Sequence, residues 1–320
     1  MRFVDVCSGG GGLALGLEQA GFTPALLVDN SKDACNTLRE NRPEWKILEE
    51  DLIDFVPDEH KESYDVDLLS AGLPRVSAAT AAKKGELYEE VKLLEATALL
   101  VHPIRPKALL VENSPDLVES PRFESVRAVF HEELDHLGYR YEWFVLNAAD
   151  FGVPQDRKQG VLVALRKDYF DSFLPPAPTV TSHTSLGEAL LPSMSSKGWQ
   201  GAEDWAAQAT SPAPTLIGGS KKHGGADLGQ TGSKRAWARM GICGLSLGND
   251  VPEPNFDWRP NGDGQAKLRI TVDQAAILQS FPQEWTITGK KTARFRQIAP
   301  ACPPPVGRAL GTAIAAALKS

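Results

Sequence analysis

A run of four glycines that directly follows a short apolar segment near the N-terminus is the strongest constraint on the fold. Residues 3–7 have the pattern of a short buried strand, residues 9–12 form the glycine run, and residues 13–20 have the apolar spacing of a helix. Glycines between a strand and a helix let the backbone approach a ligand closely at the helix N-terminus. The pattern predicts a site for a nucleotide, a phosphate group or S-adenosylmethionine. The alternative is a tight turn without a ligand.

Segments typical of strands and helices alternate over the first half of the chain. After the glycine run we expect strands at 25–29, 66–70, 108–112 and 160–165 and helices at 33–40, 87–102 and 123–137. This alternation predicts an α/β fold with a doubly wound parallel sheet, whose ligands bind at the carboxyl ends of the strands. Asp29 ends the second expected strand, where an acidic side chain would accept hydrogen bonds from the ribose hydroxyls of a cofactor.

The composition changes after the proline-rich segment 174–178. Residues 179–267 are rich in Gly, Pro, Ser and Trp and have no long periodic runs. Helical patterns return at 271–278 and 305–318. We therefore expect an α/β domain built from 1–175 plus 296–320 and a smaller, irregular lobe built from 176–295.

Composition and charge exclude several classes of protein. The chain has 320 residues, 42% of them hydrophobic, with no apolar segment that would span a membrane and no signal-peptide pattern. A net charge of −7 is not that of a general polyanion binder, although a local basic face is compatible with it. The four cysteines form no CxxC pair, which argues against a zinc site and a disulfide framework and favours a reducing cytoplasm. We expect no metal site, and the oligomeric state is not predicted.

The chain resembles the DNA cytosine-5 methyltransferases over nearly its whole length, with the matching motifs in the order of that family. The matching segments are 8–22, 27–30, 50–52, 71–74, 111–113, 147–157, 296–298 and 303–305. The resemblance implies a Rossmann-like methyltransferase fold, S-adenosyl-L-methionine as the cofactor, DNA as a partner and the smaller lobe as a target-recognition region. The cofactor-binding residues that it implies are Cys7, Ser8, Gly9, Gly11, Gly12, Leu13, Asp29, Asn30, Asp51, Leu52 and Gly72.

The same resemblance assigns the chemistry. In this family a cysteine thiolate adds to C6 of a flipped cytosine, a glutamic acid hydrogen-bonds at N3, and an arginine helps to hold the ring. Glu112 matches the glutamate and Arg157 the arginine, but Arg75 stands at the cysteine position. A guanidinium has no nucleophilic lone pair. Ser77 without an adjacent base is a weak replacement nucleophile. Cys302, which follows the last motif, is a further candidate for a relocated nucleophile.

Two interpretations of Arg75 remain open. The side chain either pairs with Glu112 or fills the empty base pocket, or it binds a carboxylate or phosphate on a different ligand. Further departures from the family fall at the base contact, the cofactor contacts and the closing loop. They are Gln159 in place of a second arginine, Cys7 in place of an aromatic residue, Ala299 and Pro300 in place of Gly-Asn, and a short alanine-rich loop at 78–85.

These departures predict that the protein no longer forms 5-methylcytosine. Methyl transfer is either lost or redirected to another substrate, such as a nucleoside or small molecule. One alternative is a noncatalytic homologue, a pseudoenzyme that binds DNA or a protein partner. Another is an active DNA methyltransferase with an unusual nucleophile. In the smaller lobe we expect DNA contacts from Lys221, Lys222, Arg235 and Trp237, because basic groups beside an aromatic ring can bind phosphates and bases. The alternative is a solvated basic patch around a structural tryptophan.

Overall fold

The computed structural model describes residues 1–78, 84–217, 225–259 and 267–320. The chain divides into two compact units. Unit 1 comprises Met1–Leu146, Lys158–Ala177 and Val306–Ser320, and unit 2 comprises Asn147–Arg157 and Pro178–Pro305. The boundaries differ from the expected ones at 147–157 and 296–305, which belong to unit 2. For 147–157 the reason is local pairing, because strand β7 (Gln155–Asp156) pairs with β9 (Ala213–Pro214) inside that unit.

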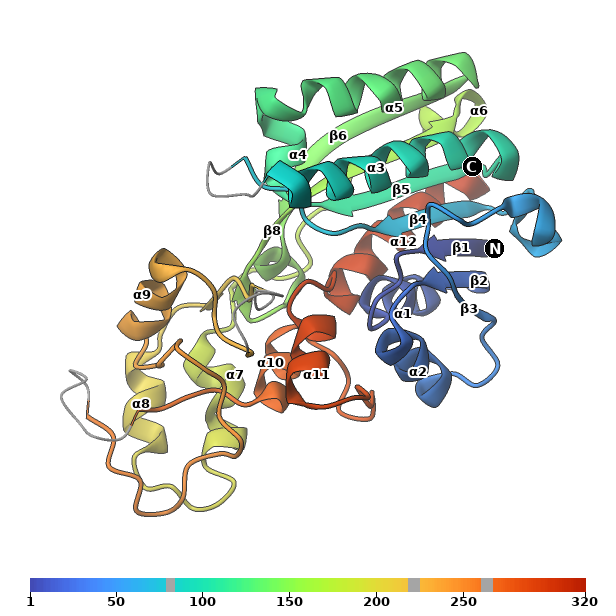
Figure 1. Ribbon diagram of the computed structural model, residues 1–320. Coiled ribbons are helices and arrows are strands. Elements are labelled where there is room, and N and C mark those ends of the chain that lie inside the picture. Colours follow the sequence, from blue (N-terminus) through green and yellow to red (C-terminus); the bar gives the residue numbers. More distant parts are fainter. Residues whose placement is uncertain (79–83, 218–224, 260–266) are drawn as a thin grey trace. The chain divides into compact units, whose positions relative to one another are not determined.

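Unit 1 contains a seven-stranded sheet with the order β3-β2-β1-β4-β5-β8-β6 (Figure 1). The strands are β1 (Arg2–Val6), β2 (Thr23–Asp29), β3 (Ile47–Glu49), β4 (Leu68–Gly72), β5 (Ala108–Asn113), β6 (Tyr139–Asn147) and β8 (Lys158–Arg166). The pairs from β3 to β5 are parallel, whereas β8 runs antiparallel to β5. The expectation of an all-parallel sheet is therefore wrong at β8, because an apolar run indicates burial but not strand direction. The edge strands β3 and β6 were not expected from the sequence.

Helices cover this sheet. They are α1 (Gly12–Gln19), α2 (Lys32–Asn41), α3 (Lys84–Ile104), α4 (Pro115–Glu119), α5 (Glu124–His136), α6 (Lys167–Phe170) and α12 (Pro304–Lys319), with short 3₁₀ turns at Pro57–Glu59, Lys61–Ser63 and Pro121–Phe123. Helices α3 and α5 lie side by side (Figure 1) and share one apolar core with the central strands, through buried residues such as Leu69, Val101, Leu109 and Phe130. This core fixes the strand ends on which the candidate site is built.

Unit 2 is more regular than expected. Within its described part the helices are α7 (Leu186–Met194), α8 (Ala202–Gln208), α9 (Thr231–Arg239), α10 (Val272–Leu278) and α11 (Lys291–Ile298), and a 3₁₀ turn spans Ala148–Phe151. Helices of seven to nine residues are too short to show a clear apolar period. Trp205 and Trp237 are fully buried at the centre of this unit. No helix in the described ranges has the length and apolarity needed to cross a bilayer.

Candidate cofactor and active site

The turn after β1 adopts the backbone conformation that its glycines predict. Gly9 and Gly11 have φ angles of 53° and 86°, in the left-handed region that glycine adopts without strain, and Cys7 has a φ angle of 54°. The turn is closed by hydrogen bonds from the N–H of Ser8 to Val28 O at 3.1 Å and from the N–H of Gly11 to Ser8 O at 3.0 Å. Gly11 is the N-cap of α1 and has no side chain to cap it. The first N–H groups of α1 are therefore suited to bind a ligand.

Asp29, at the end of β2, holds this turn in place. Its Oδ2 accepts a hydrogen bond from the N–H of Gly9 and its Oδ1 accepts one from the N–H of Ser31, both at 2.8 Å. Burial raises the pKa of this carboxyl above its ordinary value, and the two backbone hydrogen bonds oppose the shift. Each carboxylate oxygen can accept a second hydrogen bond, so the geometry is compatible with ribose hydroxyls as further donors.

The other expected cofactor residues follow neighbouring strands. Asn30 Nδ2 donates to Asp51 Oδ2 at 2.8 Å, which joins the segment after β2 to the segment after β3. The N–H of Ile53 donates to Asp51 Oδ1, and this hydrogen bond is the main reason that the pKa of Asp51 is lowered. At the end of β4, a Cβ on Gly72 would lie 3.7 Å from Cys7 O. The carboxyl ends of four adjacent parallel strands thus bring the predicted residues to one edge of the sheet.

Asp5 is a residue of this region that the sequence analysis missed. It lies in β1 with no exposed surface, and its Oδ1 accepts a hydrogen bond from Ser70 Oγ of β4 at 2.5 Å. Burial raises the pKa of Asp5 to about 7. The signal that could have revealed it is a charged residue inside a short apolar strand just before the glycine run.

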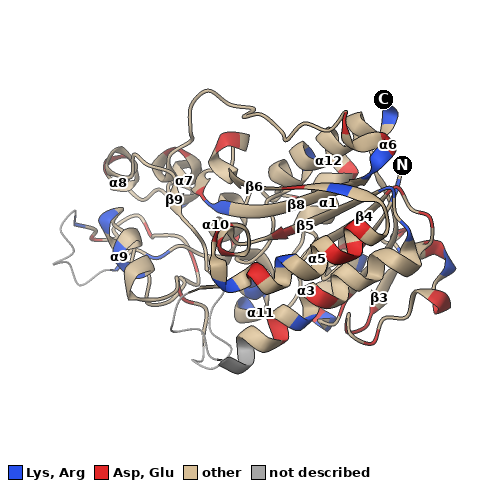
Figure 2. Cartoon of the chain, turned by 90° about the horizontal axis from the view of Figure 1, so that it is seen from above, with Lys and Arg blue, Asp and Glu red and all other residues tan. Residues whose placement is uncertain are grey.

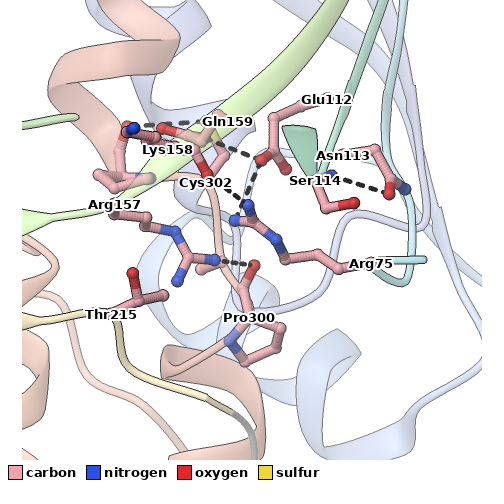
Figure 3. A network of polar contacts seen from close by, with 12 residues as sticks. Arg75, Glu112, Asn113, Ser114, Arg157, Lys158, Gln159, Thr215, Pro300 and Cys302 are labelled. Carbon is pink, nitrogen blue, oxygen red and sulfur yellow. Dashed lines mark hydrogen bonds and ion pairs between the residues drawn. The ribbon is translucent and has the colours of Figure 1, made fainter. Parts of the chain in front are cut away.

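The side chain of Arg75 points at Glu112 (Figure 3). Arg75 Nη1 lies 3.5 Å from Glu112 Oε1, and Arg75 Nη2 donates to the carbonyl of Lys158 at 2.5 Å. Gln159 Nε2 donates to the same Oε1 of Glu112 at 2.9 Å. Glu112 is 1% exposed. Of the two interpretations of Arg75, pairing with Glu112 is the contact observed.

The backbone around Arg75 is fixed by the segment that follows β5. Asn113 Oδ1 accepts from the N–H of Val76 at 2.9 Å, and Asn113 Nδ2 donates to Pro74 O at 3.1 Å. Ser114 Oγ donates to Val76 O at 2.7 Å. The chain on both sides of Arg75 is therefore anchored, and the guanidinium is directed by a well-connected loop. The sequence places Asn113 in the matching segment 111–113 and does not predict these contacts.

Arg157 belongs to unit 2 and has no exposed surface. Its Nη1 donates to the carbonyls of Leu216 and Ala299 at 3.1 and 3.0 Å, and its Nη2 donates to the carbonyl of Pro300 at 2.9 Å (Figure 3). The guanidinium therefore connects three parts of the backbone of unit 2. Ala299 and Pro300, which depart from the family motif, serve here as acceptors for this arginine. A contact of Arg157 with a base stays a prediction.

Three of the four cysteines lie in surroundings that oppose activation of the thiol as a replacement nucleophile. Burial raises the pKa of the Cys7 thiol far above its ordinary value and that of Cys35 to about 11. Cys302 is buried, with 4% of its surface exposed. A thiolate, not a thiol, is the nucleophile, so burial of this kind opposes reactivity.

The residues expected to contact DNA differ in whether the structure describes them and in whether they are exposed. Lys221 and Lys222 lie outside the described residues, as do positions 79–83 of the expected alanine-rich loop. Arg235 is exposed on α9. Trp237 on the same helix is fully buried, which agrees with the alternative of a structural tryptophan. Its ring packs in the core of unit 2.

Comparison with known proteins establishes the family. The model of the family described as C-5 cytosine-specific DNA methylase matches residues 1–316. The chain belongs to this family. It is 40% identical to the Type II methyltransferase M.NaeI of Lentzea aerocolonigenes over 319 residues, which cover 99% of this chain and 75% of that protein. It is 37% identical to the Type II methyltransferase M.NgoMIV of Neisseria gonorrhoeae over 321 residues, which cover 99% of this chain and 97% of that protein.

Solved structures agree on the fold. A prophage-encoded protein of Escherichia coli, described as a DNA modification methyltransferase, superposes with a TM-score of 0.70 at 20% identity and full coverage of both chains. The Dnmt2 methyltransferase of S. pombe superposes with a TM-score of 0.61 at 15% identity, covering 100% of this chain and 98% of that one. The expected Rossmann-like methyltransferase fold is confirmed.

S-adenosyl-L-methionine is the methyl donor of this family, and the residues of unit 1 fit it. A Cβ on Gly9 would meet no atom within 4 Å, so the backbone of the turn lies open to a ligand. Asp29 and Asp51 supply carboxylates beside the N-terminus of α1, where ribose hydroxyls and the ammonium group of the cofactor would find acceptors.

Proposed function

We propose that this protein binds S-adenosyl-L-methionine and DNA but does not form 5-methylcytosine by the covalent route of its family. The observation that carries the proposal is the position of Arg75. The side chain that replaces the nucleophile forms an ion pair with Glu112, the residue that matches the family's glutamic acid. Arginine at position 75 therefore removes the nucleophilic cysteine and also pairs with the glutamate that the reaction needs.

The chemistry explains why this arrangement opposes methylation. C5 of cytosine becomes a good nucleophile only after a thiolate has added to C6, and a protonated guanidinium cannot make that bond. The glutamic acid must also face N3 of the base. In this structure Glu112 Oε1 is occupied by Gln159 at 2.9 Å and by Arg75 at 3.5 Å. The loop that directs Arg75 is anchored by Asn113 and Ser114, which supports a settled arrangement of this side chain.

The retained turn supports cofactor binding. The bound cofactor would supply an electrophilic methyl group. The role of this chain is to bind and orient it: Asp29 holds the N–H groups of Gly9 and Ser31, and Asn30 fixes Asp51. A homologue that had abandoned the cofactor would not need this set of contacts, which stabilises an otherwise unfavourable glycine-rich turn.

Calorimetric titration with S-adenosyl-L-methionine tests the cofactor. We expect binding by the native protein and a loss of affinity of at least about tenfold in Asp29→Ala, because charge-assisted hydrogen bonds that order the turn are removed. Glu40→Ala, an exposed carboxylate on the neighbouring helix α2, is the matched control and should bind normally. Absence of binding by the native protein would contradict this part of the proposal.

Methyl transfer from labelled cofactor to duplex DNA tests the activity. We expect no label in DNA and no covalent complex with DNA that contains 5-fluorocytosine, a base that traps the covalent adduct. An active Type II methyltransferase of the family, assayed in parallel, shows that the substrate and the trap are competent. Labelled DNA or a covalent adduct with the native protein would overturn the proposal.

A further inference from the structure

We infer that Arg75 is the counter-ion that stabilises Glu112 inside unit 1, and that position 159 is the other place from which this positive charge can be supplied. The substitutions at 75 and 159 are then coupled, and neither position can be changed independently. This inference concerns the stability of the folded site and does not rest on the proposed loss of methylation.

Glu112 is the group that needs a partner. It is the penultimate residue of β5, with β4 paired on one side and β8 on the other, and 1% of its surface is exposed. Removing an ionised carboxylate from water is unfavourable unless an opposite charge or hydrogen-bond donors replace the water. The structural requirement at this point is therefore a cation within reach of the Glu112 carboxylate.

Two side chains meet the same oxygen of Glu112. Gln159 Nε2 donates to Oε1 from 2.9 Å, and Arg75 Nη1 lies 3.5 Å from it. Only the arginine carries a charge. Within the described residues, Arg75 is the single cation at salt-bridge distance from Glu112. Its Nη2 is held by Lys158 O, which keeps the guanidinium beside the carboxylate.

Position 159 could carry the charge instead. Strand β8 runs antiparallel to β5 with Glu112 opposite Val161, and the side chain at 159 already reaches Oε1. An arginine there would place a guanidinium on the same carboxylate. The family pattern noted above has arginine at 159 and cysteine at 75, whereas this chain has glutamine at 159 and arginine at 75. A positive charge beside Glu112 is therefore kept, but it comes from position 75 and not from position 159.

A double-mutant cycle tests this coupling. Thermal and urea unfolding would be measured for the native protein, Arg75→Cys, Gln159→Arg and the double variant. We expect Arg75→Cys to lower the melting temperature by several degrees, because Glu112 is left buried without a cation. Gln159→Arg should restore most of this loss in the double variant. The unfolding constants should show a coupling of at least about tenfold between the two positions.

A matched control uses another ion pair of unit 1. Arg42 Nη2 binds Glu18 Oε2 at 2.8 Å, so Arg42→Cys removes a second, more exposed ion pair of unit 1. Gln159→Arg should give no recovery in that background. Additive effects of Arg75→Cys and Gln159→Arg, or equal recovery of Arg42→Cys, would overturn the inference.

If Arg75→Cys does not fold, a further variant shows whether the unpaired carboxylate is the cause. Arg75→Cys combined with Glu112→Gln removes the charge that requires a partner, so folded protein should be recovered. Continued failure to fold would overturn the inference, because the defect would then not arise from the carboxylate. The methyl-transfer assay on the native protein is a separate measurement, so the outcomes for stability and for activity are distinguishable.

Discussion

Individual buried ionisable side chains, Glu112 and Asp5 among them, affect the stability of the folded protein. Arg75 meets Glu112 near the end of β5, whereas Oδ1 of the buried Asp5 in β1 accepts a hydrogen bond from Ser70 Oγ. Burial raises the pKa of Asp5 from 3.8 to about 7. The folded protein therefore favours the protonated carboxyl at a pH where the unfolded chain has released the proton.

The Asp5→Asn variant tests this effect. Because the pKa of Asp5 is raised on folding, its contribution to stability is fully present below about pH 4 and is lost as the pH rises to about 7. Stability of the native protein should fall relative to Asp5→Asn over this window, by up to about 1.4 kcal/mol per pH unit. Urea unfolding at a series of pH values measures it. A constant difference between the two proteins from pH 4 to 7 would contradict the prediction.

At the scale of elements, the antiparallel strand β8 is the part of the sheet that completes the candidate site. Gly160 in β8 lies opposite Asn113 in β5, immediately after the residue that binds Glu112. A Cβ on Gly160 would lie 2.3 Å from Ser114 O and 2.8 Å from Val118 Cγ2. The close approach of β8 to the segment after β5 therefore depends on the absence of a side chain at this position.

The Gly160→Ala variant should lose stability, because the backbone of Ser114 cannot retreat without moving the loop that anchors Arg75. We expect a loss of about 1–3 kcal/mol, the usual range for overpacking, measured by urea unfolding. Gly232→Ala on α9 is the control: a Cβ there meets nothing within 4 Å, and the helix should be unchanged or slightly more stable. Equal stability of the two variants would show that β8 can shift.

For the whole molecule, charge is distributed unevenly among the elements of each unit. Acidic residues are prominent on α3 and α5 of unit 1, whereas α9 of unit 2 carries basic ones (Figure 2). The chain as a whole has 34 Lys and Arg against 41 Asp and Glu. The proposed binding to duplex DNA would therefore rely on local basic surfaces and not on the average field.

This distribution predicts DNA binding that is strongly dependent on salt. The affinity for duplex DNA, measured by gel shift, should fall by at least about tenfold between 50 and 200 mM salt, because phosphate contacts release counterions. Replacing both exposed arginines of α9, Arg235 and Arg239, by serine should weaken binding at low salt. The control replaces exposed Lys61 and Lys167 of unit 1. Unchanged affinity across this salt range would contradict binding through phosphate contacts.

The sequence predicted those features that depend on local patterns. The strand–glycine–helix turn and the placement of Asp29 follow from periodicity and from the position of strand ends, whereas Asp51 and Gly72 were expected only from the family resemblance. Local patterns did not predict the direction of β8 or the edge strands β3 and β6, because strand pairing joins segments that are distant in the chain. For the same reason the sequence left two interpretations of Arg75 open, and the contacts of Asn113, Arg157 and Gln159 appear only once the fold is known.

The shared oxygen of Glu112 also bears on how this protein could change over evolutionary time. If Arg75 and Gln159 both depend on that one carboxylate, regaining a cysteine at 75 first would pass through a less stable intermediate. A lineage would have to acquire the arginine at 159 before the cysteine at 75. The order of substitutions, and not only their number, would then separate this chain from a relative with cysteine at 75 and arginine at 159.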